Sequence, residues 1–212
     1  DPDDVKEHID QFLTTPKDKA LAAVYALQPP RRLDFQYMKL TEYQDVNVLT
    51  DTDFNYLIVK GKEPIKFVYN NYKTYKKYGQ QVFDVNEDIK PYLKEYIRVI
   101  QGKGEGKYLF GANQNDKQEN SNFGTKLKDV FYMMYGEEIT SRFIRMSAAT
   151  YINNLKPKPS LKKRKDFALA MAHSRTLNEQ YEKITIDNEG DESEVQNTEI
   201  IRGRTMRTRR SK

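Results

Sequence analysis

Apolar residues spaced three and four apart predict helices near the start of the chain. This spacing runs through residues 3 to 13, and residues 15 to 18, TPKD, have the form of a capping box with proline at the first helical position. The helix that begins there is expected to end near the two prolines at 29 and 30, because proline interrupts helical hydrogen bonding. A third helical pattern follows over residues 33 to 40.

Three later segments have the composition of strands instead. Residues 55 to 61, 64 to 72 and 79 to 85 are rich in β-branched and aromatic residues, and the glycines between them are suited to turns. This pattern predicts a three-stranded antiparallel sheet inserted after the third helix.

Helical spacing then returns. Asn86 is a good N-cap for a helix that reaches residue 100, and a polar stretch over residues 101 to 122 encloses a short apolar plug, Tyr108-Leu109-Phe110. Further helices are predicted at 121–135, 140–154 (capped by Thr140), 161–171 and 177–184. The expected fold class is α+β, mainly α: a helical domain with a small three-stranded antiparallel sheet.

The end of the chain differs from the rest. Residues 1–186 are expected to form one domain, whereas residues 187–212 are first acidic and then basic, with little apolar surface to bury. We expect this tail to be disordered in the free protein or to dock on a partner subunit. The chain begins with Asp1-Pro2 and no methionine, so we interpret it as a fragment of a longer protein.

Composition restricts the function further. Hydrophobic residues make up 37% and charged residues 32% of the chain, and no apolar stretch approaches the roughly 18 residues that span a membrane. Cysteine is absent, which excludes disulfides and thiolate metal sites. The net charge is +5, and the excess lies before the tail, which favours a polyanionic partner such as nucleic acid. The alternative is a lysine-rich surface without a specific partner.

Few residues are suited to chemistry. We find no phosphate-binding GxxxxGK[ST] loop, and no acidic pair with metal-ligand spacing, which argues against nucleotide-driven or metal-assisted reactions. What remains is a set of cations near predicted element boundaries, followed by a histidine and a tyrosine: Arg31, Lys73, Arg142, Arg145, His173 and Tyr181. Taken singly, each cation could be a surface charge, and Tyr181 could be a core residue because it lies in helical register with Leu177 and Ile184.

Taken in order, these residues resemble the catalytic domain of the tyrosine recombinases, or phage-type integrases. PPRRLDFQYM contains Arg31 three residues before Asp34, and Lys73-Thr74 matches a hairpin lysine. RFIRMSAAT matches a His-x-x-Arg element, and MAHSRTLNEQY matches a Gly-His-Ser element followed by the tyrosine. The PPRR motif is most similar to the corresponding sequences of family members from eukaryotic mobile elements and from large DNA viruses or their satellites.

The resemblance implies a role for each residue. Arg31, Arg145 and His173 would bind the scissile phosphate, Tyr181 would attack it, and Lys73 would protonate the leaving oxygen, without a metal or other cofactor. The assignment of Lys73 competes with two nearby lysines, Lys76 and Lys77.

Two positions depart from the family pattern. Arg142 replaces the usual histidine and stays protonated below about pH 12, so it can only bind or steer phosphate. Ala172 replaces the usual glycine, a small change with little expected consequence for the chemistry.

The implied partner is double-stranded DNA, on which family members assemble as dimers or tetramers inside the cell, in a nucleus or where viral DNA replicates. The residues expected to contact DNA are Arg32, Lys76, Lys77, Lys163 and Arg164. The N-terminal DNA-clamp domain of the family is not recognisable in this fragment, and no membrane partner is expected.

Two other functions fit the same residues. A type IB topoisomerase shares the constellation, and a non-cleaving DNA-binding module of the same fold would explain Arg142. The basic tail could serve subunit docking, DNA contact or nuclear targeting.

Overall fold

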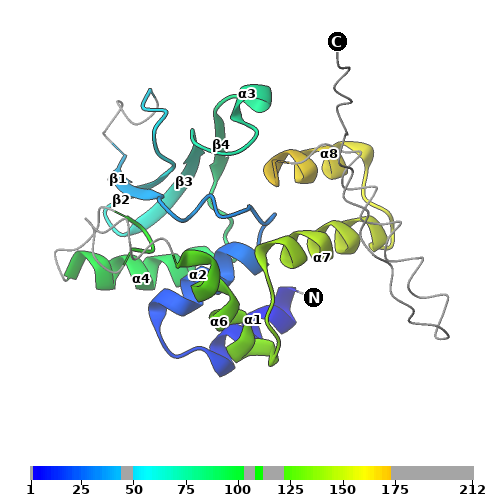
Figure 1. The fold of residues 1–212 in the computed structure, drawn as a ribbon, viewed down its shortest axis with the longest axis horizontal. Coiled ribbons are helices and arrows are strands. Elements are labelled where there is room, and N and C mark those ends of the chain that lie inside the picture. The colour runs from blue at the N-terminus through cyan, green and yellow to red at the C-terminus, as the bar shows by residue number, and fades with distance from the viewer. Residues whose placement is uncertain (1, 44–49, 103–107, 112–121, 173–212) are drawn as a thin grey trace, which may run out of the picture.

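A computed structural model describes residues 2–43, 50–102, 108–111 and 122–172 of the chain. About half of these residues are helical, and the fold is α+β (Figure 1). In chain order the elements are α1 (Pro2–Phe12), α2 (Pro16–Ala26), β1 (Lys39–Glu42), β2 (Tyr56–Lys60), β3 (Glu63–Tyr69), α3 (Tyr75–Tyr78), β4 (Gln81–Asp84), α4 (Lys90–Gly102), α6 (Phe123–Tyr135), α7 (Ser141–Asn154) and α8 (Leu161–Ala170).

The sheet has four strands in the order β1-β2-β3-β4. β2, β3 and β4 lie where the sequence predicts strands and pair antiparallel with one another. β1 adds a fourth strand parallel to β2, with Lys39 opposite Tyr56. The prediction of a three-stranded, purely antiparallel sheet was therefore wrong, because the described sheet is four-stranded and mixed.

The third predicted helix, over residues 33 to 40, was also wrong. Phe35 and Met38 are fully buried with helical spacing, but they lie in consecutive turns in which Gln36 N–H donates to Leu33 and Met38 N–H donates to Phe35. The chain then enters β1, where Lys39 N–H donates to Asn55 O at 2.8 Å. Turns with an i to i+3 hydrogen bond bury the same positions as a short helix does, so the apolar pattern alone does not separate the two.

Side-chain caps set the starts of three helices. Thr15 Oγ1 accepts a hydrogen bond from Asp18 N–H and donates one to the Asp18 carboxylate, with Pro16 at the first helical position. Thr140 accepts from Phe143 N–H at the start of α7, and Ser160 accepts from Lys163 N–H at the start of α8. The predicted start of α2, with Thr15 as cap and proline at the first helical position, and the Thr140 cap are confirmed, but the carboxylate of Asp18 accepts from the Thr15 hydroxyl and not from its backbone N–H as in a full capping box.

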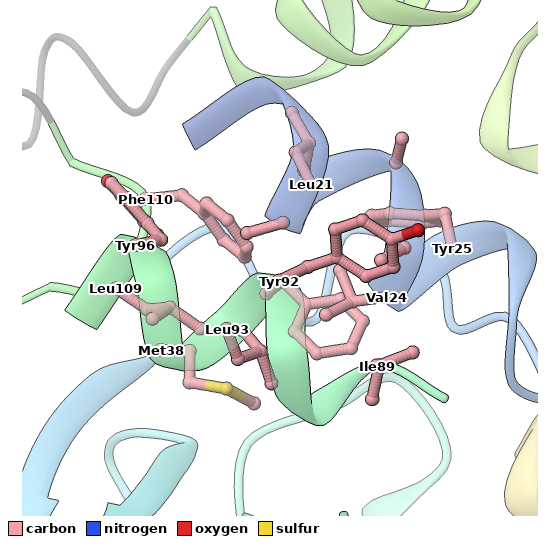
Figure 2. Packing of buried hydrophobic residues seen from close by; sticks show 14 of the residues in the cluster. Leu21, Val24, Tyr25, Met38, Ile89, Tyr92, Leu93, Tyr96, Leu109 and Phe110 are labelled. Carbon is pink, nitrogen blue, oxygen red and sulfur yellow. The ribbon is translucent and has the colours of Figure 1, made fainter. Parts of the chain in front are cut away.

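The main core lies between α2 and α4 and extends to the apolar plug (Figure 2). Leu21, Val24 and Tyr25 of α2 are fully buried in the same cluster as Leu93 and Tyr96 of α4. The plug completes this core as expected: Phe110 stacks on Tyr96 with ring centroids 5.7 Å apart, and Leu109 N–H donates to Met38 O at 2.7 Å. Because α2 is buried on nearly all sides, the segment after it starts in the protein interior, where Pro30 and Arg31 are also buried.

Figure 1 shows α1, α2, α4 and α6 below the sheet, with α7 and α8 to one side of it. None of the helices in the described part of the chain is long and apolar enough to cross a membrane. The predicted helix 177–184 and the tail 187–212 lie outside the described residues.

Candidate active site

Arg31 is buried beside the sheet. Only 1% of its surface is exposed, and its guanidinium carbon lies 3.8 Å from the centre of the Tyr69 ring of β3. Nη2 donates a hydrogen bond of 2.5 Å to Gln81 Oε1, and Nη1 lies 3.6 Å from Asp34 Oδ2. The interpretation of Arg31 as a surface charge is therefore excluded.

Arg145 is the second buried arginine, with 4% of its surface exposed. It lies on the face of α7 that also buries Ile144 and Ala149. Its Nη2 donates to the backbone carbonyl of Met171 at 3.1 Å. Arg142, one helical turn earlier, is exposed, so the two arginines of RFIRMSAAT have different environments.

Asp34 lies close enough to both buried arginines to be affected by their charges, and it forms an ion pair with Arg31. Its side chain is 11% exposed, and burial raises the pKa of the carboxyl although the positive charges of Arg31, Arg145 and Arg32 act in the opposite direction. Arg31 and Arg145, which are far apart in the sequence, thus act on the same carboxylate. Within the described ranges no donor hydrogen-bonds this carboxylate, and its nearest partner is Arg31.

The end of α8 is held by the same group of residues. The carbonyl of Leu169 accepts from Gln81 Nε2 at 3.2 Å, that of Met171 accepts from Arg145, and that of Ala172 accepts from Thr74 Oγ1 at 3.4 Å. Gln81 also holds Arg31, so both buried arginines and the loop that carries Lys73 converge on the last turn of α8.

Ala172 has a left-handed backbone, with φ of +53°. This conformation favours glycine and costs other L-residues about 1–2 kcal/mol. The replacement of the expected glycine is thus a change with a structural cost at the residue before His173. His173 and Tyr181 themselves lie outside the described residues.

Lys73 lies between β3 and α3 and is exposed. It lines an open pocket together with Asp34, and its neighbours on both sides are anchored, Tyr72 by a hydrogen bond to Gly79 O and Thr74 by its bond to Ala172 O. Lys76 and Lys77 are also exposed but lie on α3 and do not line this pocket. Among the three lysines, Lys73 is the one that lines a pocket together with Asp34.

The remaining predicted DNA contacts lie mostly at the surface. Lys76, Lys77 and Lys163 are exposed, and Arg32 and Arg164 are half-buried. Figure 1 shows that α3 and α8, which carry four of these residues, lie on the same side of the molecule. The Thr74 bond to Ala172 is consistent with this arrangement.

Sequence reasoning missed Gln81. It is 6% exposed and uses both ends of its amide, toward Arg31 and toward Leu169. A polar Gln80-Gln81 pair at the start of an apolar strand was the available signal, but it does not say which glutamine points inward.

Comparison of the chain with family models, with curated proteins and with solved structures gave no match. In the described ranges, no group of three potential metal-ligating side chains is present.

Proposed function

We propose that this chain is the catalytic domain of a site-specific DNA recombinase that cleaves and rejoins strands through a 3′-phosphotyrosyl intermediate. The observation that supports it most is the convergence of Arg31, Arg145 and the Lys73 loop on the end of α8, directly before His173 in the sequence. These residues belong to separate segments of the chain, and the tyrosine recombinase resemblance requires them in one site.

The charges of the cluster favour an anion. Three guanidinium groups, those of Arg31, Arg32 and Arg145, act on the single carboxylate of Asp34. Buried charge is costly unless it is balanced, and a phosphate would supply the missing negative charge. Each buried arginine has paired N–H donors that match the non-bridging oxygens of a phosphate. Because Arg31 and Arg145 are both buried, a phosphate can contact their guanidinium groups only if neighbouring side chains move aside.

The proposed reaction is an in-line displacement. The Tyr181 oxygen bonds to phosphorus and gives its proton to water, while the bond from phosphorus to the 5′ oxygen breaks and that oxygen takes a proton from Lys73. The arginines stabilise the charge on the phosphate in the transition state. The reverse step, with a 5′ hydroxyl from another strand as the attacking group, joins the exchanged strands without a nucleotide cofactor.

The exposed cations supply contacts that do not depend on base sequence. Lys76 and Lys77 on α3 and Lys163 on α8 are available to the DNA backbone, and exposed Arg142 can bind a phosphate near the cleaved one. We assign to the tail after residue 186 a role in docking on a second copy bound to the same DNA.

A nicked duplex tests the function. If the nick lies close to the scissile phosphate, the short released strand diffuses away and traps the covalent intermediate. The proposal predicts a protein-linked band on a denaturing gel that forms in EDTA and retains a label at the 5′ end of the cleaved strand, because the protein is joined to the new 3′ phosphate. Absence of the band with every nicked substrate would favour a non-cleaving module, and relaxation of supercoils without exchange between two sites would favour a type IB topoisomerase.

A further inference from the structure

An open pocket of about 800 Å³ lies beside the candidate active site. It is formed where the turn after α2, the segment before β2 and the loop after β3 meet. Its lining includes Leu33, Asp34, Tyr37, Phe54, Asn71 and Lys73. Two of these, Asp34 and Lys73, also belong to the site described above, so a ligand in the pocket would lie next to the proposed phosphate.

The floor of the pocket is fixed by Asn55. This side chain is 5% exposed, and its Nδ2 donates to the carbonyls of Asp34 and Asn71, each at 2.8 Å. Its Oδ1 accepts from the backbone N–H groups of Asn70 and Asn71 at 2.9 and 2.8 Å. One buried amide therefore locks the turn at Asp34 to the loop that carries Lys73, and the pocket is formed before any ligand binds.

Aromatic rings form part of the wall. Tyr37 is 37% exposed, and both Tyr37 and Phe54 pack against the ring of buried Tyr108, with centroids 6.4 and 6.2 Å away. Phe54 is further held by Lys39, whose Nζ lies 3.1 Å from the ring centre. Aromatic side chains that are fixed in this way and remain accessible are the usual stacking partners of unpaired nucleobases.

The polar lining of the pocket includes two carboxylates, which favour a ligand with N–H donors. The carboxylate of Asp34 is nearly buried, and no group in the described part of the chain donates a hydrogen bond to it. Asp53 adds a second carboxylate to the lining. Ionised carboxylates only accept hydrogen bonds, so a ligand with N–H groups would be favoured here, while Lys73 is suited to a phosphate attached to that ligand.

We propose that this pocket receives one unpaired nucleobase of the DNA, adjacent to the phosphate that reacts. The inference rests on the proposed function in taking DNA as the ligand. Guanine fits best, because its ring N–H and its exocyclic amino group are adjacent donors that can both reach one carboxylate. Stacking on Tyr37 and Phe54 would hold the base, and Lys73 would then lie beside the sugar-phosphate backbone.

Binding of bulged duplexes tests the proposal without cleavage. Three labelled duplexes of one sequence would carry a single unpaired guanine, an unpaired hypoxanthine or an abasic bulge, which has the same backbone flexibility. We expect the guanine bulge to bind about tenfold more tightly than the abasic bulge by fluorescence anisotropy, the order of magnitude of stacking one base on an aromatic side chain. Hypoxanthine, which lacks the amino group, should lie between them.

Two exposed tyrosines give matched variants. Tyr37→Ala should abolish the preference for the guanine bulge and Tyr37→Phe should keep it, whereas Tyr43→Ala, which removes a tyrosine that is 60% exposed and does not line the pocket, should leave it intact. Equal binding of the guanine and abasic bulges by the unmodified chain, or equal effects of Tyr37→Ala and Tyr43→Ala, would overturn the proposal. Covalent trapping on a nicked duplex would still succeed in that case, so the two failures are distinguishable.

Discussion

Gln81 joins Arg31 to the end of α8. Its Oε1 accepts a hydrogen bond from Arg31 Nη2 at 2.5 Å, and its Nε2 donates to the carbonyl of Leu169 at 3.2 Å. The glutamine is itself buried, so neither bond is readily replaced by water. The position of the first arginine is therefore coupled to the turn that precedes His173.

Replacement of Gln81 by methionine should break this coupling while preserving the side-chain volume. Arg31 Nη2 and the Leu169 carbonyl would each lose a partner, which we expect to lower the free energy of unfolding by about 1–3 kcal/mol. At a temperature where the variant is fully folded, formation of the covalent DNA complex should be at least tenfold slower. Gln80→Met is the matched control, because Gln80 is exposed and donates to Asn70. If both variants react at the same rate, Gln81 has no positioning role.

Arg31→Lys and Arg145→Lys should retain the positive charge but lose the paired donors of guanidinium. If these groups bind the phosphate in the transition state, each change should slow covalent-complex formation by about 100-fold or more, while DNA affinity falls only modestly. Arg98→Lys, at an exposed position of α4, is the control for the arginine-to-lysine substitution itself. Single-turnover assays at saturating DNA would measure the rates, and near-unchanged rates for Arg31→Lys would remove that arginine from the site.

The general acid can be assigned by comparing Lys73→Ala with Lys76→Ala. Loss of the proton donor should slow cleavage of an ordinary substrate, and a substrate whose 5′ leaving group needs no proton should restore the rate. We expect this rescue for Lys73→Ala alone, because Lys73 lines the pocket beside Asp34 whereas Lys76 lies on α3. Rescue of Lys76→Ala instead would move the role to that residue.

Glycine should have opposite effects at two nearby alanines. Ala172→Gly removes the strain of φ at +53°, which is worth about 1–2 kcal/mol, less the extra freedom that glycine has in the unfolded chain. Ala168→Gly, in the interior of α8, should destabilise by about 1 kcal/mol or more. Thermal unfolding of the two variants gives the comparison, and a destabilised Ala172→Gly variant would contradict the strain argument.

Local patterns in the sequence were sufficient for most of the helices and for three of the four strands. Thr15 and Thr140 cap the helices that they were expected to cap, because capping depends on residues three apart. β1 was missed since its pairing with β2 is not local, and the turns that bury Phe35 and Met38 were taken for a helix.

The site depended on the tyrosine recombinase resemblance more than on pattern. It selected Arg31 and Arg145 from many cations, and both are buried near Asp34. Gln81 was not selected, because its partners lie 50 residues before it and 88 after it and nothing in its own segment indicates them.

Replacement of Tyr181 by phenylalanine tests the central claim most directly. The change removes the hydroxyl and keeps the ring, so a nucleophilic Tyr181 predicts a folded protein that binds DNA normally and gives no protein-linked band with a labelled nicked duplex on a denaturing gel. Tyr151→Phe, at an exposed tyrosine of α7, should give the band at the level of the unmodified chain. A band of normal intensity from Tyr181→Phe would contradict the account, because another residue would then carry the attack.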